Sequence, residues 1–126
     1  MTDDLYQEII LEEYRHPQHV GHLSAPTKTV KVENASCGDS LVLEIITNAT
    51  ENVTDLAWSG QGCAISQASA SLLSSHILEN QMKISEVANL TEAQILPLLG
   101  LDQIASGRQK CLMMMVRAFQ EIEKGS

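Results

Sequence analysis

Three cysteines and one aspartate are the residues of this chain whose types and settings could do chemistry. Cys37 and Asp39 lie two positions apart in a turn-rich stretch, Cys63 follows Gly-Gln-Gly, and Cys111 precedes an apolar run. Thiolates bind soft and borderline metal ions and attack sulfur, whereas a carboxylate is a harder ligand. Metal binding and sulfur transfer must therefore be weighed against a structural role, because a lone cysteine is most often an inert buried residue.

The charge balance narrows the partners that these residues could serve. The chain has 126 residues, with 16 acidic and 8 basic side chains and a formal charge of -8. A net negative chain repels nucleic acid and anionic membranes, and the few aromatic residues argue against stacking on bases. The expected partners are metal cations or proteins with basic patches.

The expected cellular compartment is inferred from the lack of targeting and membrane-spanning segments. No N-terminal stretch has the order of a signal peptide, and no apolar run approaches the ~20 residues of a membrane span. We therefore expect a cytoplasmic protein whose thiols stay reduced. An odd number of cysteines in that setting favours reactive, metal-bound or buried thiols over disulfides.

The hydrophobic pattern predicts one α+β domain over residues 1–126, in which a three-stranded antiparallel meander packs against helices. Alternating apolar residues separated by turn signals predict three strands. Helical spacing predicts the remaining elements. The expected strands are 28–34, 41–47 and 53–59, and the expected helices are 3–15, 64 to a stop at 80, 84–88, 92–99 and 108–124.

The meander brings distant site residues to one place. The first strand ends at the turn that holds Cys37 and Asp39, the second runs away from it, and the third runs back toward Cys63. Strand order alone therefore predicts that these three residues share one end of the sheet. Asp39 by itself is equally an ordinary turn residue, since aspartate favours turns through local hydrogen bonds.

Two of the cysteines occupy helix starts. Gly60 and Gly62 allow a tight turn before Cys63, and Cys111 falls in the first turn of the last predicted helix. The macrodipole and the unpaired N–H groups at a helix N-terminus favour a thiolate. These settings weaken the interpretation of Cys63 and Cys111 as inert core residues.

Three histidines and a run of methionines are weaker candidates for a metal or cofactor site. His16, His19 and His22 are spaced by three, but Pro17 interrupts helical geometry, so we expect a solvated loop rather than a metal site. Met113, Met114 and Met115 point in three directions of a helix and are expected to fill the core.

Three segments together resemble a known family. They are NASCGDSL at 34–41, SGQGCAISQASAS at 59–71 and GRQKC at 107–111. In this order they are similar to the U-type iron–sulfur cluster assembly scaffolds IscU and SufU, whose fold is also that of SufE proteins. The resemblance implies metal or cluster ligands at Cys37, Asp39, Cys63 and Cys111. It also implies a cysteine desulfurase that supplies persulfide sulfur to one of Cys37, Cys63 and Cys111, and apoproteins that receive the product.

The sequence does not decide between the two branches of this family, and two functions are therefore considered. Lys110 stands where IscU-type members have a histidine, which favours SufU, yet the insertion usual in SufU between the second and third cysteines is missing. One function is a scaffold, not itself an enzyme, that carries a transient iron–sulfur cluster. The other is a zinc-bound sulfurtransferase that relays sulfur without building a cluster. A structural zinc module is disfavoured because the chain has no Cys-x-x-Cys pair.

Overall fold

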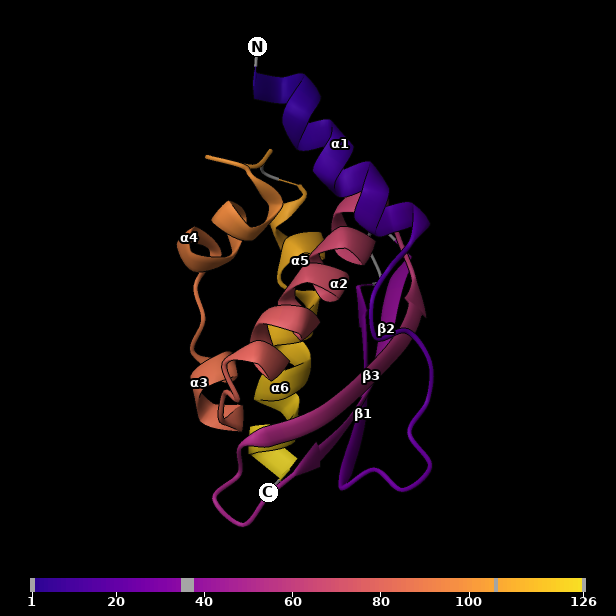
Figure 1. Cartoon of the computed structure of the whole chain (residues 1–126), viewed down its shortest axis with the longest axis vertical. Helices are drawn as coiled ribbons and strands as arrows, with labels where there is room; N and C mark the ends of the chain where they lie inside the picture. Colours follow the sequence, from indigo (N-terminus) through magenta and orange to yellow (C-terminus); the bar gives the residue numbers. More distant parts are fainter. Residues whose placement is uncertain (1, 35–37, 106, 126) are drawn as a thin grey trace.

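The computed structural model describes residues 2–34, 38–105 and 107–125, with side chains from residue 8 onward (Figure 1). Helices and a single sheet account for most of these residues. Their bounds are α1 Thr2–Arg15, β1 Lys28–Asn34, β2 Asp39–Thr47, β3 Val53–Gln61, α2 Ala64–Glu79, α3 Ile84–Ala88, α4 Glu92–Ile95, a 3₁₀ helix η1 Leu96–Leu99, α5 Gln109–Leu112 and α6 Met114–Gly125.

The sheet is an antiparallel meander in the order β1-β2-β3, as predicted. β2 is central, and its side chains alternate between buried and half-buried positions over most of its length. Its buried residues pair with buried residues of β3, as in the pairs Leu43 with Trp58 and Ile45 with Leu56. The sheet therefore turns one apolar face toward the helices, because side chains two apart on a strand share a face.

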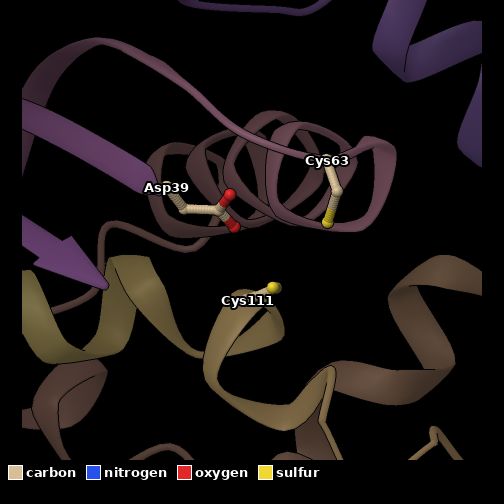
Figure 2. A group of neighbouring side chains, drawn as sticks. All are labelled: Asp39, Cys63 and Cys111. Atoms are coloured by element: carbon tan, nitrogen blue, oxygen red, sulfur yellow. The ribbon is translucent and has the colours of Figure 1, made fainter. Parts of the chain in front are cut away.

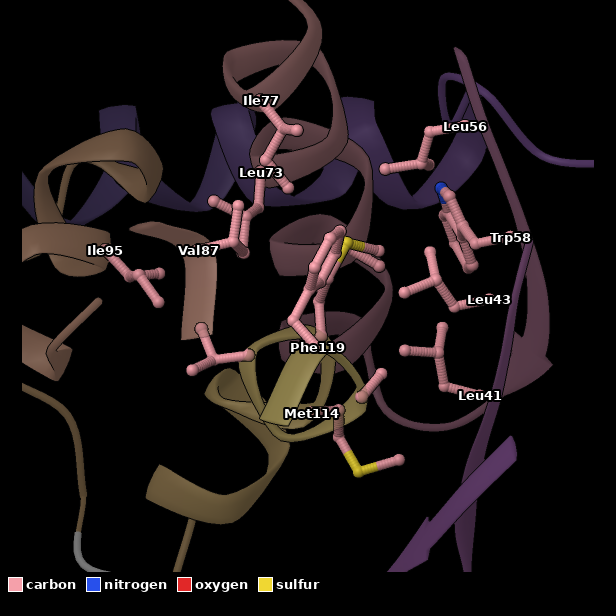
Figure 3. Close-up of a cluster of buried hydrophobic side chains, with 14 of the residues drawn as sticks. Leu41, Leu43, Leu56, Trp58, Leu73, Ile77, Val87, Ile95, Met114 and Phe119 are labelled. Carbon is pink, nitrogen blue, oxygen red and sulfur yellow. The ribbon is translucent and has the colours of Figure 1, made fainter. Parts of the chain in front are cut away.

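The helices cover that apolar face. α2 and α6 pack against the strands, and α3 packs along α6 (Figure 1). One cluster of buried apolar residues joins the layers, with Phe119 of α6 between α2 and the inner face of β2 (Figure 3). Burial of apolar area of this kind is the main stabilising term of a small domain.

Two strands are longer than predicted, and the difference moves a site residue. β1 has the expected bounds, but β2 begins at Asp39 and β3 continues to Gln61. Asp39 is therefore a strand residue, buried on the same face as Leu41, so its interpretation as an ordinary turn residue is wrong. Gly60 lies inside β3 rather than in a turn. An added Cβ at this position in β3 would collide with the carbonyl oxygen of Ser40.

The helical region also differs from the expected pattern. The predicted helix 92–99 is α4 followed by a 3₁₀ turn with Pro97 near its start. The predicted last helix is interrupted at Met113, whose φ and ψ are −97° and 9°, and so becomes α5 and α6. Proline lacks an N–H and favours the first turn of a helix, which accounts for the first break.

The N-terminal helix is fixed to α2 by polar contacts as well as by Ile10, which joins the core. The Ser71 hydroxyl donates to Glu13 Oε1 at 2.6 Å, and the N–H of Gln18 donates to the same hydroxyl at 2.7 Å. The three loop histidines are exposed, as predicted. Among the residues described, no helix combines the length and the apolar character that crossing a membrane requires.

Candidate metal centre

Asp39 opens the site at the first position of β2. The residue is 4% exposed, and Oδ2 has no hydrogen-bond partner among the described residues. A Cβ on Gly62 would lie 2.8 Å from Asp39 Cγ and would also collide with the Ser66 hydroxyl. Glycine at position 62 therefore lets the carboxylate lie directly against the chain that leads into Cys63.

Cys63 connects β3 to α2 and occupies the N-cap of that helix. Its backbone is extended, with φ −74° and ψ 171°, and its side chain is half-buried. The Ser66 hydroxyl and the Gln67 N–H both donate to the Cys63 carbonyl, at 3.0 and 3.1 Å. These bonds fix the first turn of α2, and Cys63 lies at the start of this helix, as predicted.

The surroundings of Cys63 favour its thiolate. Burial raises the pKa of the Cys63 thiol, but the Ser66 N–H, the Cys111 side chain and the Ile65 N–H lower it. The charge of Asp39 opposes them, and the net effect still holds the pKa of Cys63 below its ordinary value. Hydrogen bonds to the sulfur thus outweigh desolvation, and the thiolate is the form that binds metal.

Cys111 approaches from the other side of the site, on the short helix α5. It is 3% exposed, more deeply buried than the edge position that the sequence predicted. One ligand atom each from Asp39, Cys63 and Cys111 lies within 4.8 Å of the others. Figure 2 shows the two sulfur atoms facing each other, with the Asp39 carboxylate beside them.

The three ligand atoms line a small open cavity of about 390 Å³. Gly38, Gly62 and Gly107 also line the cavity, and at these positions only backbone faces it. Arg108 is an exposed cation on the same wall. Larger hollows lie along α1 and between α3 and α6, but their described linings include neither cysteine nor histidine, so size alone does not identify this site.

The donor set fits a borderline-soft metal. Two thiol sulfurs and a carboxylate oxygen are ligands that zinc and iron accept. A buried carboxylate oxygen without a hydrogen bond is costly, and a bound cation would remove that cost. The site can therefore hold a metal ion, and its cysteines can also attack a persulfide.

The predicted site residues are thus brought together where the structure describes them. Asp39 and Cys63 share one end of the sheet, as the meander predicted, and Cys111 joins them. Cys37, the fourth predicted ligand, lies outside the described residues. Gly38, its neighbour, donates its N–H to the Asn34 carbonyl at 2.9 Å in the link between β1 and β2.

Comparison with known proteins identifies the family. Residues 5–124 match the family described as the NifU-like N-terminal domain. The chain belongs to this family. Its resemblance to U-type scaffolds, predicted from three short motifs, is thereby confirmed, and the family match covers almost the whole chain.

The relatives of this chain include one SufU protein and two IscU proteins. "Zinc-dependent sulfurtransferase SufU" of Bacillus subtilis (strain 168) is 32% identical over 68% of this chain and 59% of its own length. "Iron-sulfur cluster assembly scaffold protein IscU" of Thermotoga maritima is 34% identical over 70% of this chain and 60% of its own length. The IscU scaffold of Streptococcus pyogenes serotype M1 is 30% identical over 59% of this chain and 45% of its own length. The chain therefore spans about half to three fifths of these relatives.

Solved structures share the fold. FiSufU of the thermophilic Fervidobacterium islandicum AW-1 superposes with a TM-score of 0.74 at 21% identity, over 96% of this chain and 98% of its own. The N-terminal part of a nitrogen-fixing NifU-like protein from Brucella abortus gives 0.75 at 21% identity, over 98% of each chain. The α+β meander with helices is therefore the fold of this family.

Two features of the site were missed by sequence reasoning. Gly62 was expected only to allow the turn before Cys63, but it also makes room for Asp39, and Arg108 was not considered as part of the cavity wall. The arginine lies in the GRQKC segment that carried the family resemblance. Its position three residues before Cys111 was the available signal.

Proposed function

We propose that this chain is an iron–sulfur cluster assembly scaffold that holds metal through Cys37, Asp39, Cys63 and Cys111. The observation that carries the proposal is the meeting of Asp39, Cys63 and Cys111, with a buried Asp39 oxygen that has no hydrogen-bond partner among the described residues. Membership in the NifU-like N-terminal family supports it. The expected partners are a cysteine desulfurase and the apoproteins that accept the cluster.

Chain connectivity supports Cys37 as the fourth ligand. Only Gly38 separates it from Asp39 in the sequence. Consecutive Cα atoms are ~3.8 Å apart, so residues two positions apart in any chain have Cα atoms at most about 7.6 Å apart. A cysteine this near to Asp39 in the chain can complete a set of three sulfurs and one oxygen.

The cysteines are also suited to receive sulfur. In this step a thiolate of this chain attacks the outer sulfur of a desulfurase persulfide, and a new S–S bond forms as the old one breaks. The desulfurase cysteine leaves as a thiolate, so no separate oxidant is required. The lowered pKa of Cys63 and its half-buried position support it as an acceptor, alongside Cys37 and Cys111.

A zinc-bound sulfurtransferase is the second candidate function. Two observations favour it: Lys110 precedes the third cysteine, and the Bacillus subtilis relative carries that name. In this function the same four side chains would hold zinc, and sulfur would pass through the site without a cluster being built. The donor set fits zinc as well as it fits iron.

Metal and sulfur analysis of the purified protein separates the two functions. The protein is incubated with iron, a cysteine desulfurase and cysteine, and its absorption spectrum, metal content and intact mass are recorded. A scaffold should show a stable cluster spectrum and should transfer the cluster to an apo-ferredoxin. The Cys63→Ser variant, which lacks one sulfur ligand, is the control.

The outcomes point in different directions. Zinc retained throughout, with a persulfide on this chain but no cluster spectrum, would favour the sulfurtransferase. Absence of both a bound metal and a persulfide, beside a desulfurase proven active, would contradict both functions.

A further inference from the structure

A buried serine links the helix that begins after Cys63 to the helix that carries Cys111. Ser69 lies in the middle of α2 and is 2% exposed. Its hydroxyl donates to the carbonyl of Leu112 at 2.7 Å. Leu112 directly follows Cys111 and is fully buried, so this bond joins α2 to the last residue of α5.

α5 cannot fix its own position. It has four residues, and helices much shorter than ~12 residues are marginal without tertiary contacts. It also ends at the interruption at Met113, so it does not continue as one helix into α6. The last carbonyls of a helix have no partner within that helix, and the Ser69 hydroxyl supplies one for Leu112.

We propose that Ser69 is a positioning residue that sets the separation of the Cys63 and Cys111 sulfur atoms. Cys63 is fixed at the N-cap of α2, and Ser69 fixes α5 against the same helix. Both cysteines are thereby positioned by the same helix, α2. Second-shell hydrogen bonds orient ligands in metal sites in a similar way. This inference rests on the proposed metal site only for its effect on metal affinity.

Serine suits this position for two reasons. Its side chain is small enough for close approach of two helices, and it carries a hydroxyl donor. Another buried serine of α2 offers a matched comparison: Ser74 is fully buried, and its hydroxyl donates at 2.8 Å to the Ser71 carbonyl of the same helix. Both hydroxyls are buried and bonded, but only the bond of Ser69 reaches α5.

The first test uses the metal-free protein. In a Cys37→Ser background only two thiols remain, and the short bis-alkylating reagent dibromobimane reacts with both when they lie close together. We expect Ser69→Ala to lower the yield of the Cys63–Cys111 cross-link at least about threefold, because α5 loses its tie to α2. Ser74→Ala should leave the yield unchanged.

The second test measures zinc affinity by chelator competition in the otherwise unchanged chain. Ser69→Ala should weaken zinc binding roughly tenfold, as loss of a second-shell partner does in other sites, and Ser74→Ala should not. Ser69→Thr keeps the hydroxyl and should retain both properties. Thermal melts of all three variants establish that each is folded.

Two results would overturn the positioning role. One is that Ser69→Ala and Ser74→Ala give equal cross-linking and equal affinity. The other is that a folded Ser69→Thr protein loses both the cross-link and the zinc affinity. This second result would overturn the role even if Ser69→Ala does not fold. If the unchanged chain binds neither zinc nor iron, the proposed metal site fails, while the cross-linking test on the metal-free protein still decides the role of Ser69.

Discussion

The apolar core and the metal end of the sheet are built from different kinds of residue. The core between β2 and α6 consists of large side chains such as Leu43, Trp58 and Phe119. At the metal end, the buried or tightly placed residues are small or polar, among them Asp39 and Gly62. The core gains stability from buried area, whereas the metal end depends on close backbone approach.

Because the two regions differ in this way, we expect stability and metal binding to be separable by mutation. Burial of large apolar groups is roughly proportional to area and tolerates similar replacements. A buried carboxylate oxygen without a partner among the described residues is instead a local cost. Substitutions in the core should therefore change folding, and substitutions at the metal end should change metal binding first.

The largest expected effect is on the core side of this comparison. Phe119 is fully buried, and Phe119→Ala should lower the free energy of unfolding by about 3–5 kcal/mol because it leaves a cavity. Urea unfolding of the metal-free protein measures the change. A loss below about 1 kcal/mol would show that the core is not the main stabilising region.

At the metal end, removal of a sulfur ligand should strongly weaken metal binding but hardly change stability. Cys63→Ser should weaken zinc binding by about a hundredfold or more, beyond the loss expected for a second-shell residue. Cys63 is half-buried, so the unfolding free energy of the metal-free protein should change by about 1 kcal/mol or less. Chelator competition and urea unfolding on the same preparation give both values, and unchanged zinc affinity would exclude Cys63 as a ligand.

Gly62 tests whether close approach matters at the site. Gly62→Ala places a Cβ 2.8 Å from Asp39 Cγ and should weaken zinc binding about tenfold by displacing the carboxylate. Gly107→Ala is the control, because Gly107 lines the same cavity but nothing lies within 4 Å of its Cβ position. Equal affinities for the two variants would contradict the role assigned to Gly62.

Asp39→Ala should have a smaller effect on stability, and of the opposite sign to Phe119→Ala. It removes a buried acceptor that lacks a hydrogen bond among the described residues, so the metal-free protein should gain about 1 kcal/mol. Loss of the one hard, exchangeable ligand should also slow cluster release to an apo-ferredoxin. Lower stability together with unchanged transfer would mean that Asp39 serves the fold alone.

The smallest expected effect is on pH dependence. The folded pKa of Cys63 lies below its ordinary value, so the thiolate stabilises the fold. This stabilisation is complete above the unfolded pKa of about 8.5 and is lost as the pH falls through the folded pKa. Alkylation of Cys63 should accordingly have a lower pH midpoint in native than in urea-unfolded protein, and Cys111→Ala should reduce the difference. Identical midpoints would contradict the hydrogen-bonded thiolate.

Much of this arrangement could be predicted from sequence, but its closest contacts could not. Alternating apolar residues predicted the meander, and strand order then predicted that Asp39 and Cys63 meet. Pattern reasoning failed where small residues decide the geometry: the buried serines of α2 look polar, and the interruption at Met113 lies within an unbroken helical pattern. Such contacts depend on how closely helices pack, which residue periodicity does not encode.

In the proposed site, sulfur from the cysteines and oxygen from Asp39 bind one metal ion. X-ray absorption at the zinc edge of the zinc-loaded protein tests it most directly, because Zn–S bonds are about 2.3 Å and Zn–O bonds about 2.0–2.2 Å. We expect three sulfurs and one oxygen per zinc, with one sulfur lost in Cys63→Ser. A first shell without sulfur, or a shell unchanged by Cys63→Ser, would contradict it.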